Sequence, residues 1–148
     1  MNATIKLNQM DVQAFRRWLR WEDKETQQKC QNLIARTAED IARGAQSNAS
    51  GAFDNPTGRL QSSIKTRYTA DKMGATVAVG VDYGPYKEFG TGELVEVPSG
   101  LEDYAMQFKG AGLRKVNQRP KPYFFSAVEK AATNFFRELK QMGFDERP

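Results

Sequence analysis

Apolar residues recur at intervals of three and four in three parts of the chain, and each part predicts a helix. A short first helix begins near Val12, where Asp11 can act as its N-cap, and carries Phe15 and Leu19 on one face. A long second helix covers about residues 24–48. The apolar stripe along this helix is narrow and rich in small residues, so another element can approach it closely. The stripe consists of Cys30, Leu33, Ile34, Thr37, Ala38, Ile41 and Ala45.

The third helix follows residues 121–125 and stops at Gly143. Its apolar seam consists of Phe125, Val128, Ala132, Phe135, Leu139 and Met142, and is widened by Phe124, Ala131 and Phe136. A seam with four phenylalanines fits packing across a sheet, and contact with a neighbouring copy is the alternative.

Alternating residues predict a β-hairpin before the third helix. One strand covers residues 62–70, with Ile64, Thr66 and Tyr68 on one face. The other covers residues 75–82, with Val77, Val79 and Val81 facing the core, and residues 70–74 form the hairpin loop. Because two strands make a marginal sheet, we expect a third strand from residues 4–8, from residues 93–118 or from a neighbouring subunit.

The predicted fold class is therefore α+β. A small antiparallel sheet packs against a long N-terminal helix and a C-terminal helix, with a long loop between the hairpin and the last helix. Residues 1–148 form one domain, in which residues 1–23 are an N-terminal arm and short helix and residues 93–120 an extended loop.

The amino-acid composition excludes several kinds of catalytic and metal-binding site. The 148 residues contain no histidine and one cysteine, which excludes Cys/His zinc sites and nucleophile pairs that use histidine as the base. We expect no catalytic residue, metal or cofactor. Neither a run of about 18 apolar residues nor a signal-type N-terminus is present, so we expect no membrane segment and a chain kept in the cytoplasm.

Charge is concentrated in the long loop. The net charge is +4, and five basic residues without an acidic one lie between residues 109 and 121, namely Lys109, Arg114, Lys115, Arg119 and Lys121. A basic cluster of this kind permits contact with nucleic acid but does not require it.

Two other segments are candidate contact sites. Trp18 and Trp21 form either a packed helix end or a docking surface. Residues 83–89 form a short helix or turn with Pro85 near its first position, followed by glycines at 90 and 92.

In this segment Tyr83, Tyr86 and Phe89 would pack a helix onto the sheet, while Gly90 supplies a backbone angle that other residues resist. Glu88 would accept hydrogen bonds from backbone N–H groups or pair with an arginine such as Arg59. The alternative is that the whole segment forms an inter-subunit contact.

Three segments in this order resemble a known family. They are Asn55–Ile64, with a Pro-Thr-Gly-x-Leu turn; Tyr83–Gly92, with a Tyr-x-x-Tyr-x-Glu-Phe-Gly-Thr box; and Arg119–Ala127, a Pro-aromatic start to the last helix. The set resembles the small tail-component proteins of long-tailed bacteriophages, described as neck, head–tail joining or tail-completion proteins. The similarity spans residues 24–142, and residues 93–118 match only in being a loop.

The resemblance implies a virion protein, assembled in the host cytoplasm, that forms a ring, six-fold in the family. It would join head-side connector proteins to the tail tube or tail terminator, and its channel would pass double-stranded DNA. It also implies no enzymatic activity. The basic cluster of residues 109–121 is then a solvated linker, a lining of the DNA channel, or a clasp on an acidic patch of a neighbouring ring. Two rivals are a free-standing nucleic-acid-binding protein and a carboxylate-metal nuclease built on Asp71, Asp82 and Glu88.

Overall fold

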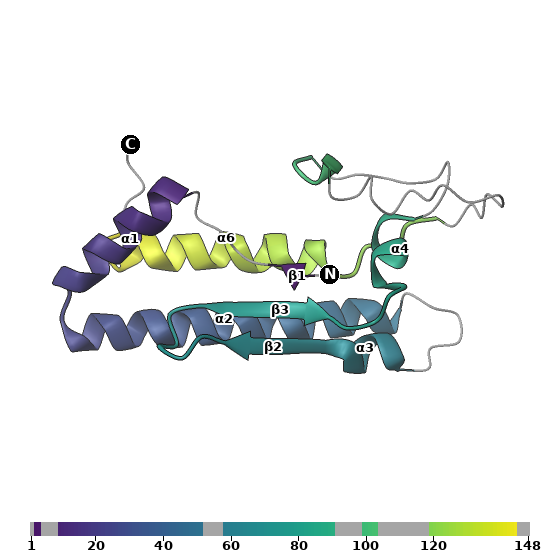
Figure 1. Cartoon of the computed structure of the whole chain (residues 1–148), viewed down its shortest axis with the longest axis horizontal. Coiled ribbons are helices and arrows are strands. Elements are labelled where there is room, and N and C mark those ends of the chain that lie inside the picture. Colours follow the sequence, from purple (N-terminus) through teal and green to yellow (C-terminus); the bar gives the residue numbers. More distant parts are fainter. Residues whose placement is uncertain (1, 4–8, 52–57, 91–98, 104–118, 145–148) are drawn as a thin grey trace.

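The computed structural model describes residues 2–3, 9–51, 58–90, 99–103 and 119–144 (Figure 1). The elements are β1 (Asn2–Ala3), α1 (Gln9–Trp21), α2 (Lys24–Ser50), α3 (Arg59–Ser63), β2 (Ile64–Tyr68), β3 (Ala75–Val79), α4 (Gly84–Phe89) and α6 (Phe125–Gln141). The predicted α+β class is confirmed, because a small antiparallel sheet packs against a long helix, α2, and a C-terminal helix, α6.

The sheet has the order β1-β3-β2, and both pairings are antiparallel. The predicted hairpin is confirmed, although Ser62 and Ser63 belong to α3, a short helix that the sequence pattern does not reveal. The third strand comes from the N-terminus, where Asn2 pairs with Ala78 and Ala3 with Val77. It therefore lies before residues 4–8, which are outside the described residues.

Fewer side chains of the hairpin are buried than the alternating pattern predicts. Ile64, Val77 and Val79 are buried, but Tyr68 is 46% exposed and Val81 is half-buried. Tyr68 lies at the hairpin-loop end of β2, opposite Ala75, whereas Ile64 lies opposite Val79 at the end that packs into the core. Burial thus decreases along β2 toward the loop.

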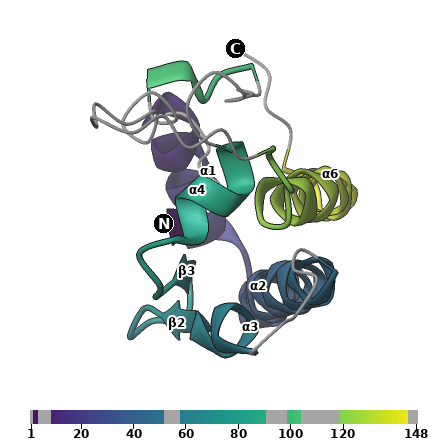
Figure 2. The same ribbon diagram turned by 90° about the vertical axis from the view of Figure 1, so that its right-hand side faces the viewer.

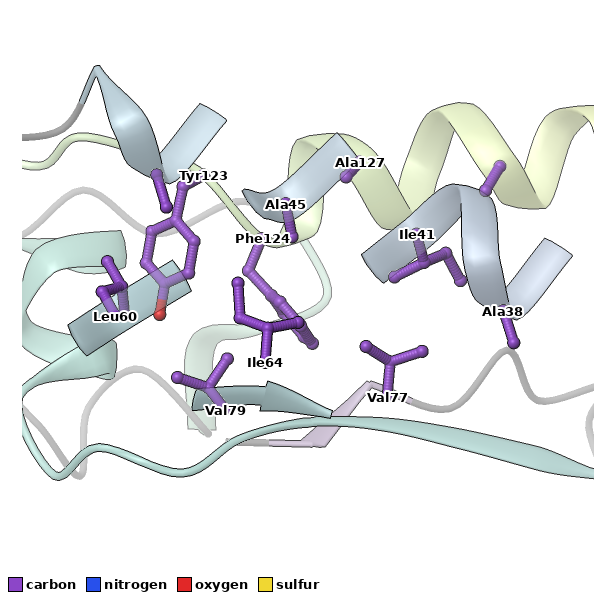
Figure 3. Close-up of a cluster of buried hydrophobic side chains, with 12 residues drawn as sticks. Ala38, Ile41, Ala45, Leu60, Ile64, Val77, Val79, Tyr123, Phe124 and Ala127 are labelled. Atoms are coloured by element: carbon purple, nitrogen blue, oxygen red, sulfur yellow. The ribbon is translucent and has the colours of Figure 1, made fainter. Parts of the chain in front are cut away.

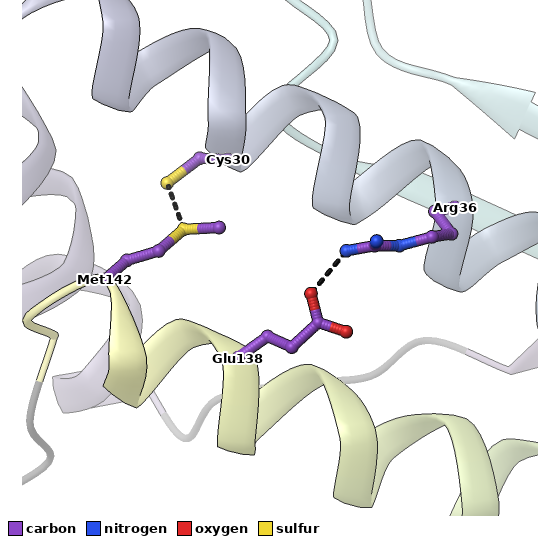
Figure 4. Close-up of polar contacts among 4 residues, drawn as sticks. All are labelled: Cys30, Arg36, Glu138 and Met142. Carbon is purple, nitrogen blue, oxygen red and sulfur yellow. Dashed lines mark hydrogen bonds and ion pairs between the residues drawn. The ribbon is translucent and has the colours of Figure 1, made fainter.

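Helices α2 and α6 pack side by side and run in opposite directions (Figures 1 and 2). Four contacts fix their register, and they join Cys30 to Met142, Arg36 to Glu138, Gly44 to Ala127, and Asn48 to the carbonyl oxygen of Tyr123. The first two are shown in Figure 4. A Cβ placed on Gly44 would lie 3.1 Å from the Cβ of Ala127, which confirms that small residues on α2 allow close approach.

The main core lies between the sheet and these two helices (Figure 3). Its deepest large side chains, Tyr123 and Phe124, are both 0% exposed. On α6 the buried positions are Ala127, Ala131 and Leu139, whereas Phe125, Val128 and Phe135 of the predicted seam are half-buried. The predicted seam is therefore confirmed in part. Leu139 of the seam is buried, as are Phe124 and Ala131, which widen it. Ala127, which the seam did not include, is buried against Gly44 of α2.

A second, smaller core closes the other end of the α2–α6 pair. It contains Cys30, Leu33, Leu139 and Phe144, and α1 packs on it through Phe15, Trp18 and Leu19. The rings of Phe15 and Phe144 meet edge to face at 5.3 Å between centroids. Helix α1 begins at Gln9, so the prediction that Asp11 is its N-cap was wrong.

Helix α2, in contrast, has a side-chain cap at its start. The Asp23 carboxylate accepts a hydrogen bond from the Thr26 backbone N–H at 2.8 Å, and this bond lowers the pKa of Asp23. The predicted helix of residues 24–48 is confirmed and ends two residues later, at Ser50.

The buried thiol of Cys30 gives a testable consequence. Burial raises the pKa of the Cys30 thiol, so the folded protein holds the thiol proton more tightly than the unfolded chain. The associated stability is present below about pH 8.5, the pKa of an exposed thiol, and is lost as pH rises toward the folded-state pKa.

We expect slow labelling of Cys30 by a neutral disulfide reagent at pH 8 and complete labelling in urea. Between pH 8 and 10, the free energy of unfolding should fall more steeply for the native chain than for Cys30→Ala. Equal slopes, measured by urea titration, would contradict this account.

Candidate functional site

The candidate site is the corner formed by α4 and the residues that lead into α6. Helix α4 has Pro85 in its first turn, as predicted, and it separates two faces. Tyr83 and Tyr86 face outward and are 37% and 39% exposed, while Glu88 and Phe89 are 2% and 1% exposed. The prediction that all three aromatics pack inward is therefore right only for Phe89.

The Glu88 carboxylate caps the start of α6. Its Oε2 accepts hydrogen bonds from the backbone N–H groups of Tyr123 and Phe124 at 2.8 and 2.9 Å. Its Oε1 accepts a third, from the N–H of Phe125 at 3.0 Å. Of the two arrangements expected for Glu88, the structure shows the one with backbone donors.

These hydrogen bonds supply acceptors that the sequence at the start of α6 does not provide. The first N–H groups of a helix have no partner within the helix, and a side chain at the N-cap commonly supplies one. The N-cap residue here is Phe124, which supplies none. A negative charge also suits the positive end of the helix dipole, so a carboxylate from α4 serves both needs.

A backbone bond extends the same junction. The N–H of Lys121 donates to the carbonyl oxygen of Lys87 at 2.8 Å, next to the Glu88 contacts. Lys87 itself is only 6% exposed, which sequence reasoning missed. Residues 119–123 belong to neither a helix nor a strand, and Pro120 and Pro122 bias the residue before each of them toward extended backbone.

Two glycines make the corner possible. A Cβ on Gly84 would lie 2.8 Å from the Tyr123 hydroxyl oxygen and 2.9 Å from Cγ1 of Val79, closer than a side chain permits. Gly90 ends α4 with φ 80° and ψ −175°, a conformation essentially restricted to glycine, as predicted. Gly92 lies outside the described residues. The role of Gly84 was not predicted.

The other predicted contact residues are distributed around the molecule. Lys109, Arg114 and Lys115 lie outside the described residues, whereas Arg119 and Lys121 are exposed beside the corner. The two tryptophans separate: Trp18 packs into the second core, and Trp21 is 89% exposed. Trp18 therefore has the packed position that one of the two interpretations predicts. Of the two tryptophans, only Trp21 is exposed enough to act as a docking residue.

The acidic residues do not converge. Asp71 lies in the hairpin loop before β3, Asp82 follows that strand, and both oxygens of Glu88 are engaged by α6. Within the described residues, no group of three or more His, Cys, Asp or Glu side chains is placed to hold a metal ion. The arrangement expected of the nuclease rival is therefore not found there.

Asp71 has a structural role instead. Its Oδ1 accepts hydrogen bonds from the Thr69 hydroxyl at 2.6 Å and the Met73 N–H at 3.0 Å, and these bonds lower its pKa. They hold the hairpin loop, in which Lys72 adopts a positive φ of 59°.

Comparison with family models, curated proteins and solved structures gives no match to this chain. In the ranges that the structure describes, no helix has the length and apolar character needed to cross a membrane. The resemblance to the bacteriophage family therefore depends on the three sequence segments alone.

Substitution of Glu88 tests whether the corner is a structural junction. Glu88→Ala should lower the free energy of unfolding by at least about 3 kcal/mol, because each orphaned buried donor costs roughly 1–3 kcal/mol. Glu88→Gln should cost about 1–3 kcal/mol, since the amide keeps an acceptor oxygen but loses the charge and presents a donor.

Urea titration measures both variants, with the exposed Glu129→Gln on α6 as the matched control. Oligomer formation is measured separately by light scattering. Native stability together with lost assembly would show that Glu88 acts between subunits and not within the fold.

Proposed function

We propose that this chain is a structural subunit of the neck, or head–tail connector, of a long-tailed bacteriophage. It assembles as a ring, six-fold if it follows the family, between head-side connector proteins and the tail tube or tail terminator. The ring leaves a channel for double-stranded DNA, and the chain works by holding partners together and carries out no catalysis.

One observation carries the proposal: the three segments that resemble the family meet at one junction. Glu88 of the second segment binds the backbone of Tyr123, Phe124 and Phe125 in the third. Leu60 of the first segment, 3% exposed, packs in the same core cluster as Tyr123 and Phe124 (Figure 3). Segments that form one structural unit are a stronger basis for a family resemblance than three separate matches.

The distribution of aromatic side chains also favours assembly. Among the described residues, the large apolar side chains with the highest exposure are Trp21, Tyr68, Tyr83 and Tyr86, at 89%, 46%, 37% and 39%. Tryptophan and tyrosine are enriched where interfaces derive most of their binding energy. They lie on three different elements, α1, β2 and the start of α4, which suits a subunit with more than one contact surface.

Negative-stain electron microscopy and light scattering of the purified chain test the proposal, with and without tail tubes. We expect rings with an open centre, either in free solution or at the ends of tail tubes. A chain that stays monomeric in both conditions and decorates no tube end would contradict the ring assignment.

DNA retention tests the channel. Rings should hold double-stranded DNA weakly and independently of sequence, and retention should fall as salt rises, because phosphate contacts release counterions. The described basic residues of the cluster, Arg119 and Lys121, are exposed beside the corner, so Arg119→Glu with Lys121→Glu should reduce retention.

Filter binding at 50 and 200 mM salt provides the measurement, and the variant Lys130→Glu on the exposed side of α6 is the control. No retention at low salt would count against a DNA-lined channel. Tight, sequence-selective binding by a monomer would instead support the free-standing nucleic-acid-binding protein.

A further inference from the structure

An open groove of about 670 Å³ lies between α1, α2, the hairpin and α6, away from the Glu88 corner. Its floor is apolar and includes Phe15, Leu19, Ile34, Met73, Val77 and Phe135. All of these side chains except that of Val77 are half-buried, so their apolar surface is open to a ligand. A volume of this size is typical of a binding pocket.

The rim of the groove has a net positive charge. Arg16 and Arg20 of α1 line it and are exposed, and neither forms an ion pair with a described carboxylate. Asp71 is the one acidic residue in the lining, and its carboxylate is engaged by Thr69 and Met73. The groove therefore fits a segment that combines apolar side chains with acidic ones.

The chain itself contains such a segment. Residues 93–108 include four acidic residues, Glu93, Glu96, Glu102 and Asp103, and no basic one. Their apolar residues are Leu94, Val95, Val97, Leu101, Tyr104, Met106 and Phe108. Within the described part, Glu102 and Asp103 are exposed and Leu101 is half-buried.

The described residues of this segment, 99–103, do not line the groove of their own chain. In Figure 1, α1 and the hairpin loop are toward the left end of α2 and α4 is at the right, whereas the green residues 99–103 lie above the middle of the molecule. The groove of each chain is therefore not filled by the described part of its own segment, and it can receive the segment of a second copy.

We propose that the groove of one subunit receives the acidic, apolar segment 93–108 of a second copy, so that subunits join head to tail. The contact uses different surfaces on the two partners, and such contacts close into rings when the rotation permits. This inference deepens the proposed ring and relies on it for the number of partners, but the docking itself can be measured without a ring.

A labelled synthetic peptide of residues 93–108 tests the docking by fluorescence anisotropy against the full chain, at protein dilutions where light scattering gives a monomer. We expect saturable binding that weakens with salt and is about tenfold weaker for Arg16→Glu with Arg20→Glu. The control variant, Arg17→Glu with Arg137→Glu, changes the same charge at exposed positions outside the groove and should bind like the native chain.

The matched control peptide carries Gln or Asn in place of its four acids and should bind more weakly. Absence of saturable binding at low salt, or equal binding to the groove variant and the native chain, would overturn the proposal.

A charge exchange then tests whether the contact is between subunits. Arg16→Glu with Arg20→Glu, and separately Glu102→Lys with Asp103→Lys, should each abolish assembly alone. An equimolar mixture should restore it, because each reversed surface finds its complement on the other chain. Restoration only when all four substitutions lie in one chain would show docking within a subunit and overturn the proposal.

The two hypotheses fail separately. Rings that persist in the groove variant would refute the docking and leave the neck assignment standing. Peptide binding by a chain that never forms rings would support the docking and contradict the neck assignment.

Discussion

The buried carboxylate of Glu88 is the interaction on which the arrangement of the other elements depends. A carboxylate that is 2% exposed is tolerated only when it is hydrogen-bonded, and here three backbone N–H groups donate to its two oxygens. Those groups belong to the first turn of α6 and the residues before it, so α6 must begin at the corner. Its antiparallel register against α2 follows, from the bond between Asn48 and the Tyr123 carbonyl at one end to the contact of Cys30 with Met142 at the other.

A helix pair fixed in this way has two chemically different ends. At the corner end, aromatic side chains and backbone amides are gathered around one carboxylate, and the exposed charges nearby are Arg119 and Lys121. At the other end, α1 leaves an apolar groove with Arg16 and Arg20 on its rim. Ends that differ in shape and charge suit contacts between unlike surfaces, which is the kind of contact that a ring requires.

The sequence predicted the elements whose signals are local, and missed those that depend on distant residues. Helix α2, the hairpin and the stop at Gly143 follow from periodicity and turn residues, and all three are observed. The burial of Ala127 on α6 could not be predicted, because it depends on the close approach of Gly44 in another helix. The corner was partly readable: no capping side chain precedes Phe125, and Glu88 stands among aromatics. Glu88 lies 35 to 37 positions before the residues whose N–H groups it binds. Periodicity relates only residues that are close in the sequence, so it could not connect the two observations.

How much the family resemblance says about function depends on which motif residues are buried and which are exposed. The motif residues at the junction, Leu60, Glu88 and Tyr123, are at most 3% exposed, so most of what the motifs describe is a scaffold. Tyr83 and Tyr86 of the second motif are the exceptions, at 37% and 39% exposed. Scaffolds are shared by proteins with different functions, and function depends on what the scaffold exposes. The residues that must distinguish a neck subunit from any other use of this fold are therefore the exposed ones. They include Tyr83 and Tyr86 of the second motif and, outside every motif, Arg16, Arg20 and Trp21 of α1. A chain with the corner intact and these α1 residues altered would still fold, and its assembly would reveal whether the ring depends on the α1 end.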